Sequence, residues 1–170
     1  MNAQLSPAQP PSPSHRPMVL ADLDAVMAVE AVAYAFPWTR ANFIDSVAAG
    51  HRCELRLDAE GEVIGYTVTL TALDELHLLN ITVCPDLQGQ GHALALMDRL
   101  IAHGSRHGQR TLWLEVRPGN ARARRLYQRC GLREVGLRRG YYPAGLGRRE
   151  DAIVMSMALP EAGPAAHGLD

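Results

Sequence analysis

Apolar side chains recur along this chain in two spacings, which predict one domain of mixed helices and strands. An apolar position every three or four residues indicates an amphipathic helix, whereas strict alternation indicates a half-buried strand. Helical spacing predicts helices over the ranges 22–35, 39–49, 91–107 and 120–130. Runs typical of strands occupy the ranges 18–20, 53–57, 63–73, 76–83, 111–116, 135–142 and 152–159. Because strands lie on both sides of a single helical crossover, we expect a mixed α/β sheet with helices on both faces.

The length and composition suit one folded domain with a tail at each end. The chain has 170 residues, and its hydrophobic content of 47% supports a substantial core. We expect the folded domain to span residues 16–159. The proline-rich segment 1–15 and the C-terminal segment 160–170 are expected to be disordered tails. The first segment lacks the apolar centre of a signal peptide, and no run approaches the ~20 apolar residues of a membrane helix.

The charge of the chain is balanced overall but unevenly distributed. A net charge of −1 gives no reason to expect binding to nucleic acid or to a membrane. The chain has no lysine, and ten of its 17 arginines lie in the range 117–149, which contains a single acidic residue, Glu134. This cluster indicates either a solvated surface or a local site for phosphates or for an acidic partner.

The cysteines and histidines give no evidence of a disulfide framework or of a metal site. Cys53, Cys84 and Cys130 are far apart and odd in number, which favours a reducing cytoplasm. His103 and His107 have the spacing of metal ligands on one helix face, but no third ligand is nearby. Histidine is also favoured at a helix C-terminus because of the helix dipole. We therefore expect no metal.

The stretch 88–93, Gln-Gly-Gln-Gly-His-Ala, joins a predicted strand to a predicted helix and is the strongest indication of a ligand site. Two glycines at a helix N-terminus let backbone N–H groups surround an anion, and the helix dipole adds about half a positive charge. A Walker loop would need Gly-Lys-Ser/Thr, and a dinucleotide fingerprint would need a third glycine at Leu94. The loop therefore predicts a phosphate-bearing ligand of another kind, with a plain turn as the alternative.

Two side chains are candidates for proton transfer. Glu115 lies in the predicted strand 111–116 and shares one face with Trp113. An apolar setting raises the pKa of carboxyl groups in general, so a carboxylate there can act as a general base. The alternative is an ion pair with Arg117 or with an arginine of the next helix. Tyr127 lies on the apolar side of the helix 120–130, where it either packs in the core or donates a proton.

Four aromatic residues flank proline turns and have two possible roles. Phe36, Trp38, Tyr141 and Tyr142 are either exposed groups that recognise a substrate or apolar groups that pin their loops to the core.

Taken together, these motifs resemble the GNAT acetyltransferases. The range 88–93 resembles the loop that binds the pyrophosphate of acetyl-CoA, and 120–132 resembles the Asn-x-x-Ala…Leu-Tyr…Gly motif of that family. Further segments are similar to members that acetylate the N-terminal alanine of a small-subunit ribosomal protein: 35–38, 79–81, 112–117, 141–143 and 149–152. The chain departs from the family pattern at His92-Ala93, where Leu-Gly is usual, and at Leu132, where Phe is usual.

The resemblance implies a fold and a set of site residues. The GNAT fold is a mixed, mostly antiparallel sheet that is splayed between its fourth and fifth strands, with helices on both faces. The resemblance implies Glu115 as general base and Tyr127 as general acid at the wedge-shaped opening between these strands. It also implies acetyl-CoA as cosubstrate, bound by Ile81, Thr82, Val83, Gln88, Gly89, Gln90, Gly91, His92, Ala93 and Asn120.

The activity implied is transfer of an acetyl group from acetyl-CoA to the N-terminal α-amine of an alanine-starting ribosomal protein. We expect this reaction in the cytoplasm, catalysed by a monomer or a weak dimer that binds its peptide through Phe36, Trp38, Tyr141 and Tyr142. One alternative is an acetyltransferase for lysine side chains or small amines. Another is a non-catalytic acetyl-CoA sensor, which would have no need of two proton-transfer residues.

Overall fold

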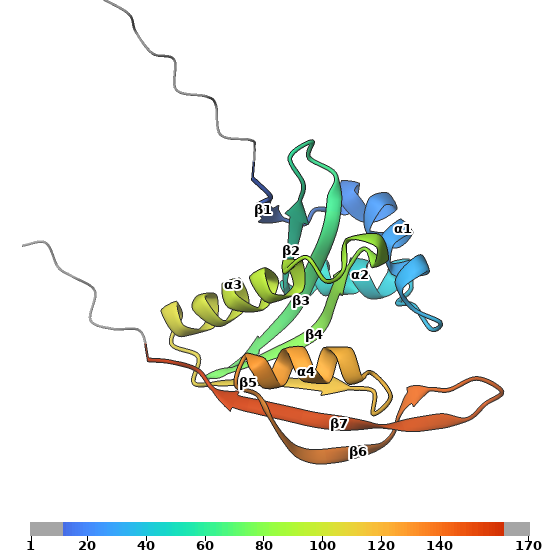
Figure 1. Ribbon diagram of the computed structural model, residues 1–170, viewed down its shortest axis with the longest axis vertical. Coiled ribbons are helices and arrows are strands. Elements are labelled where there is room, and N and C mark those ends of the chain that lie inside the picture. Colours follow the sequence, from blue (N-terminus) through green and yellow to red (C-terminus); the bar gives the residue numbers. More distant parts are fainter. Residues whose placement is uncertain (1–11, 162–170) are drawn as a thin grey trace, which may run out of the picture.

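The computed structural model describes residues 12–161, which form a seven-stranded sheet in the order β1-β2-β3-β4-β5-β7-β6 (Figure 1). Most of the two expected tails lies outside the described residues. The strands are β1 (Ser14–Pro17), β2 (Arg52–Leu57), β3 (Val63–Ala72), β4 (Glu75–Val83), β5 (Thr111–Val116), β6 (Arg133–Pro143) and β7 (Arg149–Ala158). The helices are α1 (Leu23–Ala33), α2 (Arg40–Ala48), α3 (His92–Arg106) and α4 (Ala121–Arg129), with short 3-10 turns η1 (Leu20–Asp22) and η2 (Pro85–Leu87).

The sheet is mixed and opens between β4 and β5, as the GNAT resemblance predicts. These two strands are parallel, whereas all other neighbouring pairs are antiparallel. Their pairing joins only Glu75–Leu78 to Thr111–Leu114. Residues 79–83 of β4 therefore have no strand partner on the β5 side, which leaves a wedge in the middle of the sheet.

The first strand is the one element whose predicted place is wrong. We expect it at 18–20, but the structure places it at Ser14–Pro17, where it begins two residues inside the segment expected to be a tail. The chain turns immediately afterwards because the Asp22 carboxylate accepts a bond from the Val19 N–H at 2.8 Å and pairs with the Arg16 guanidinium at 2.7 Å. This local bonding favours a 3-10 turn over a continued strand, and apolar spacing does not reveal it.

Helix ends follow their local chemistry. Thr39 caps α2, since its hydroxyl accepts a bond from the Asn42 N–H. The first helix ends at Ala33, two residues before its predicted end, and Tyr34 is already extended. The Tyr34 side chain reaches β4, where its hydroxyl donates to the Ile81 carbonyl at 3.0 Å.

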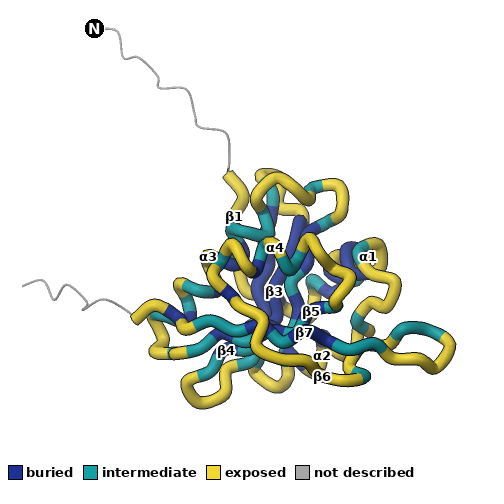
Figure 2. The backbone as a smooth tube through the Cα atoms, turned by 60° about the horizontal axis from the view of Figure 1, so that its bottom comes forward, coloured by how far each residue is buried: buried dark blue, intermediate teal, exposed yellow. Residues whose placement is uncertain are grey.

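Two apolar clusters hold the layers together, one on each face of the sheet. Figure 2 shows buried residues along the central strands, β3 among them. In one cluster Phe43 of α2 packs against Tyr66 of β3, and both side chains are fully buried. In the other, Met97 of α3 and Tyr127 of α4 pack with the buried face of β5, which includes Leu114. Helices α1 and α2 thus cover one face and α3 and α4 the other. No helix in the described part of the chain is long and apolar enough to cross a membrane.

Candidate active site

Two cavities meet at the opening between β4 and β5. The larger, of about 710 Å³, is bordered by the loop 88–93 and by α4, and is called here the glycine-loop cavity. The smaller, of about 570 Å³, is bordered by the α1–α2 loop, β5 and the end of β6, and is called the aromatic cavity. Four residues line both cavities: Tyr34, Ile81, Asn120 and Tyr127. Ligands in the two cavities would therefore meet at these four side chains.

The loop 88–93 has the backbone geometry of an anion site. Gly89 and Gly91 have φ values of 86° and 88°, in the left-handed region that favours glycine. Gly91 is also the N-cap of α3, so the first N–H groups of that helix have no partner within the helix. Gly89, Gly91, His92 and Ala93 line the glycine-loop cavity, whereas the exposed Gln90 does not.

Gln88 braces this loop. Its side-chain amide donates to the Val83 carbonyl at 3.0 Å, and its oxygen accepts a bond from Arg122 at 2.8 Å. The side chain predicted to contact the ligand thus connects the end of β4 to α4.

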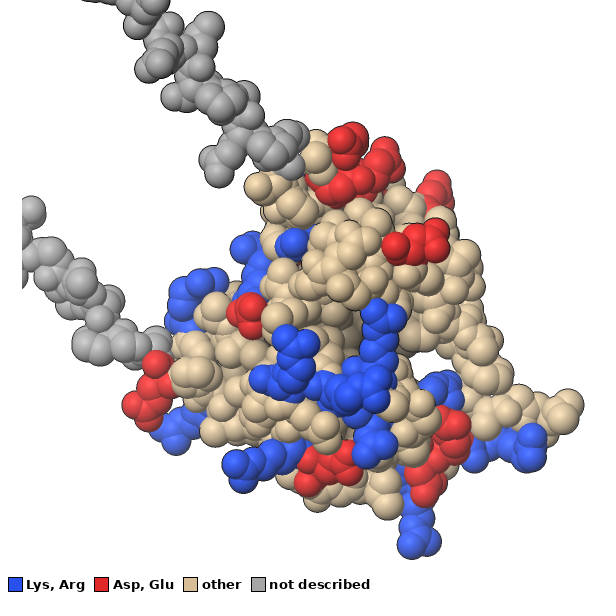
Figure 3. Space-filling model, viewed as in Figure 1, with Lys and Arg blue, Asp and Glu red and all other residues tan. Residues whose placement is uncertain are grey.

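Arginines of α4 give the glycine-loop cavity a positive wall. Arg122, Arg125 and Arg129 line it, and Figure 3 shows arginines gathered around a hollow in the middle of this face. Of the two alternatives for the arginine cluster, the phosphate site therefore has structural support for these three residues. Bidentate, permanently charged guanidinium groups suit phosphate oxygens.

His92, which departs from the family pattern, is held by a neighbouring strand. Arg56 of β2 donates to its Nδ1 at 3.1 Å. Burial and then the charge of Arg56 lower the pKa of His92 below its usual value of 6.5. Because the guanidinium can only donate, His92 is neutral in this arrangement and carries its proton on Nε2.

The free edge of β4 offers backbone groups to the glycine-loop cavity. Cys84 N–H donates to the Ile64 carbonyl of β3 at 3.0 Å. Backbone directions alternate along an antiparallel pair, so Ile81 and Val83 direct their N–H and C=O groups away from β3, towards the wedge. The Tyr34 hydroxyl satisfies the Ile81 carbonyl at 3.0 Å. The N–H groups of this edge remain available to an extended ligand. The Thr82 side chain is buried and also lines this cavity.

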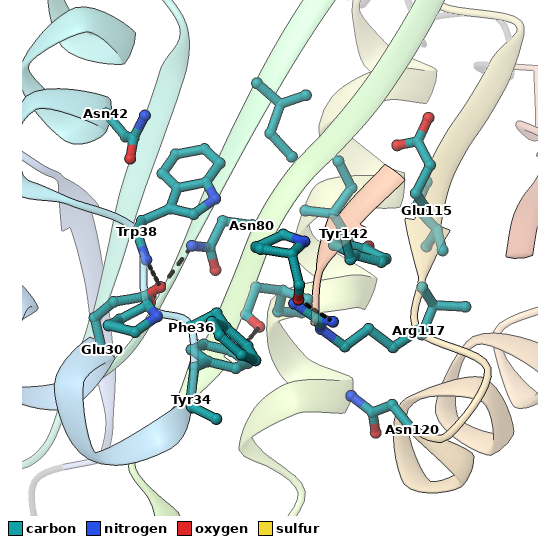
Figure 4. Close-up of a pocket in the computed structure, with 18 of the residues that line it drawn as sticks. Glu30, Tyr34, Phe36, Trp38, Asn42, Asn80, Glu115, Arg117, Asn120 and Tyr142 are labelled. Carbon is teal, nitrogen blue, oxygen red and sulfur yellow. Dashed lines mark hydrogen bonds between the residues drawn. The ribbon is translucent and has the colours of Figure 1, made fainter. Parts of the chain in front are cut away.

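The aromatic cavity contains three of the four predicted aromatic residues. Phe36, Trp38 and Tyr142 line it (Figure 4). Tyr141 lies outside its lining and packs edge-on against Tyr142. Trp38 also packs against the buried Phe43, with ring centroids 5.3 Å apart, so it fixes its loop as well as bordering the cavity. Phe36 is 44% exposed and open to a ligand.

Glu115 lines the aromatic cavity and forms an ion pair, the predicted alternative, but with a partner that the sequence does not predict. Its carboxylate accepts a bond from Arg138 of β6 at 2.7 Å, so the partner is neither Arg117 nor an arginine of α4. Its side chain is 19% exposed and lies on the face of β5 opposite Leu114. Glu115 and Tyr127 thus come from opposite faces of β5, yet both line this cavity because it lies at the wedge.

Tyr127 and Asn120 lie where the two cavities join. Tyr127 is 6% exposed, and its burial raises the pKa of its hydroxyl well above the usual value of 10. The hydroxyl therefore keeps its proton at neutral pH, which a general acid requires. Asn120 caps α4 by accepting a bond from the Ala123 N–H at 3.1 Å, which leaves its side-chain NH₂ for a ligand.

A buried carboxylate that our sequence interpretation misses also lines the aromatic cavity. Glu30 of α1 is 1% exposed and accepts bonds from the Trp38 N–H at 2.7 Å and from Asn80 at 3.4 Å (Figure 4). It also accepts a bond from the Tyr66 hydroxyl. The sequence does contain a signal for it, because Glu30 lies on the apolar side of a predicted helix. A carboxylate at such a position is buried only when other groups hydrogen-bond to it or pair with its charge. Glu30 connects the α1–α2 loop to β4.

No group of three or more histidine, cysteine or acidic side chains within residues 12–161 is arranged to hold a metal ion. The rings of His103 and His107 stack on each other, with centroids 4.0 Å apart.

A sheet opened between two parallel strands, with a candidate anion loop on one side and candidate proton-transfer groups on the other, suits an acyl-transfer enzyme. The sequence model of the acetyltransferase (GNAT) family matches residues 23–132, and the chain belongs to this family.

Among its relatives is the [ribosomal protein bS18]-alanine N-acetyltransferase of Escherichia coli K12, which is 41% identical over 138 residues, or 81% of this chain and 92% of the relative. The protein of the same name from Haemophilus ducreyi is 33% identical over 81% of this chain and 94% of its own length. The crystal structure of the ribosomal-protein-S18-alanine N-acetyltransferase from E. coli superposes with a TM-score of 0.80 and 36% identity. That match covers 91% of this chain and 99% of the crystallised one.

Proposed function

We propose that this protein transfers the acetyl group of acetyl-CoA to the N-terminal α-amine of a protein, and that its substrate is the alanine-starting ribosomal protein bS18. The observation that carries the proposal is the meeting of two cavities at Tyr127, one suited to a phosphate-bearing thioester and one to a peptide. The names of the relatives supply the substrate. A ribosomal-protein substrate implies a cytoplasmic reaction.

The glycine-loop cavity fits acetyl-CoA. The N–H groups at the start of α3, together with Arg122, Arg125 and Arg129, would hold its phosphates. The outward-facing backbone of Ile81 and Val83 would pair with the amides of its pantetheine arm, in place of a strand. This orientation directs the thioester to the junction of the two cavities, next to Tyr127.

The reaction needs a neutral amine and a good leaving group. The α-amine of a peptide has a pKa of ~7.7–8.0, compared with ~10.4 for lysine, so its deprotonation at pH 7 is easier by about 3.4 kcal/mol. The neutral amine nitrogen attacks the thioester carbon, and Glu115 accepts the proton that this nitrogen then loses, directly or through a water molecule. The C–S bond breaks and Tyr127 gives its proton to the departing thiolate. Tyr127 regains a proton when Glu115 releases its own.

An oxyanion forms between these steps, and an outward-facing backbone N–H of β4 would stabilise it. Removal of one such donor typically slows an enzyme by ~10² or more. No covalent enzyme intermediate is required, because both substrates can be bound at once.

Release of CoA thiol from acetyl-CoA tests the function. An alanine-starting peptide with the N-terminal sequence of bS18 is compared with an N-blocked peptide whose only amine is a lysine. We expect release with the first peptide and none with the second. Release only with the lysine peptide would overturn the assignment in favour of lysine acetylation. Tight binding of acetyl-CoA without release from either peptide would identify a sensor.

The roles of the two proton-transfer residues are tested by Glu115→Gln and Tyr127→Phe. Each substitution keeps the size of the side chain, so we expect acetyl-CoA binding to persist while turnover falls at least ~10²-fold, the lower range for general acid–base catalysis. Glu134→Gln is the matched control, because Glu134 pairs with Arg124 on the surface at 2.7 Å. Wild-type turnover in both variants would contradict these roles.

A further inference from the structure

Arg117 lies at the edge of the aromatic cavity, between two segments that are far apart in the sequence. It follows the last residue of β5 and faces the α1–α2 loop on one side and the β6–β7 hairpin on the other (Figure 4). Its guanidinium carbon lies 4.4 Å from the ring centre of Tyr142 and 5.5 Å from that of Phe36. The planar cation therefore lies between an aromatic ring of each segment.

Polar bonds fix the same guanidinium to the hairpin. Its Nη1 donates to the Pro143 carbonyl at 3.1 Å and forms an ion pair with Glu150 at 3.1 Å. The two segments also approach each other directly, since a Cβ on Gly145 would lie 3.6 Å from the Phe36 ring. The contacts of Arg117 thus extend to both walls of the aromatic cavity.

We infer that Arg117 is a positioning residue that clasps the α1–α2 loop to the β6–β7 hairpin and so holds the peptide cavity in its binding shape. The inference rests on the proposed function, which assigns the aromatic cavity to the peptide. Arginine suits this role and lysine does not, because only a flat guanidinium stacks on aromatic rings while its edge donates in fixed directions.

We expect the clasp to affect binding of the peptide and not binding of acetyl-CoA. Arg117 does not line the glycine-loop cavity, so its loss leaves the acetyl-CoA site intact. Without it, the loop and the hairpin separate, and the peptide has to order both segments when it binds. That ordering is unfavourable and weakens binding of the peptide.

Steady-state kinetics with the alanine-starting peptide test the clasp. Arg117→Met keeps the aliphatic stem and removes the cation, and we expect KM for the peptide to rise about tenfold, the effect of losing the stacked cation and its ion pair. Arg117→Lys keeps the charge without the planar group, and we expect an intermediate rise. The KM for acetyl-CoA and kcat should each change less than about threefold, which a general loss of structure would not allow.

Arg139→Met is the matched control, because it removes one arginine from an exposed position of β6. Its KM for the peptide should equal that of the wild type. An unchanged peptide KM in a folded Arg117→Met protein would overturn the inference. Equal losses of peptide and acetyl-CoA affinity would do so as well.

Amide hydrogen exchange in the resting protein separates failure of the clasp from failure of the proposed function. We expect Arg117→Met to speed exchange in residues 34–38 and 142–148 together, and to leave α3 unchanged. This result would support the clasp even if the wild type acetylated no alanine-starting peptide. Unchanged exchange in both segments would refute the clasp, whatever the substrate is.

Discussion

Substitution of Gly65 by alanine is expected to displace β4 from the side on which it pairs with β3. Gly65 lies in β3 opposite Val83 of β4. A Cβ there would lie 2.7 Å from the Thr82 carbonyl oxygen, 0.7 Å less than the 3.4 Å at which ordinary contact begins. It would also lie 3.3 Å from side-chain carbons of Leu96 and Val83. Because the closest atom belongs to the backbone, the strand itself has to move.

We expect this displacement to lower both the stability of the protein and its affinity for acetyl-CoA. Overpacking of this kind costs ~1–3 kcal/mol, and each kcal/mol lowers the melting temperature of a chain of this size by roughly 2–4 °C. The displaced residues are those whose backbone would pair with acetyl-CoA, so we also expect its Kd to rise about tenfold, equivalent to ~1.4 kcal/mol. Thermal unfolding and calorimetric titration with acetyl-CoA measure the two effects.

Gly136→Ala provides the control for Gly65→Ala. Gly136 lies in the exposed strand β6, and a Cβ there would meet nothing within 4 Å. Alanine is favoured over glycine inside a strand by roughly 0.5–1 kcal/mol, so this variant should be as stable as the wild type or slightly more so. Wild-type stability and acetyl-CoA affinity in Gly65→Ala would refute the argument from close packing.

Three further predictions concern charge. Burial first, and then the charge of Arg52, lower the pKa of His103 in the folded chain to about 4. The unfolded chain takes up this proton near pH 6.5, so the free energy of unfolding should fall by about 1 kcal/mol between pH 6.5 and 4. Urea unfolding at the two pH values should show a smaller fall in His103→Gln. Arg122→Met should raise KM for acetyl-CoA several-fold, by the loss of roughly 1 kcal/mol of phosphate bonding, and leave the peptide KM unchanged; equal effects on both substrates would contradict this. Arg138→Gln should slow turnover about tenfold without changing acetyl-CoA binding, because Glu115 loses the partner that orients it; faster turnover would show that the ion pair restrains the base instead.

Elements with strong apolar spacing and clear end chemistry could be predicted from the sequence. The predicted and observed ranges of β5 are both 111–116, and Thr39 caps α2 as expected. The first strand could not be placed, because the bond between Asp22 and Val19 decides its end and depends on backbone direction. Periodicity describes which face of an element is buried, but it does not describe such local competition.

The candidate site also contains features that the sequence predicts and features that it does not. Residues 88–93 form a local motif, so the sequence alone places the glycine loop at a helix start. The partner of Glu115 could not be found in this way, because sequence proximity favours Arg117 whereas the strand order β5-β7-β6 brings Arg138 within reach. Glu30 was missed for the same reason, since Tyr66 and Asn80, two of its three hydrogen-bond donors, lie 36 and 50 residues away.

The unpaired edge of β4 makes the folded state depend on what fills it. Under the proposed function, a thioester that lies against Ile81 and Val83 would take the place of a missing strand, and it would bind the native chain rather than the unfolded one. At a hundredfold excess over its Kd, such a ligand adds ~2.7 kcal/mol to the free energy of unfolding. The stability of the folded chain would then rise and fall with the concentration of its thioester ligand.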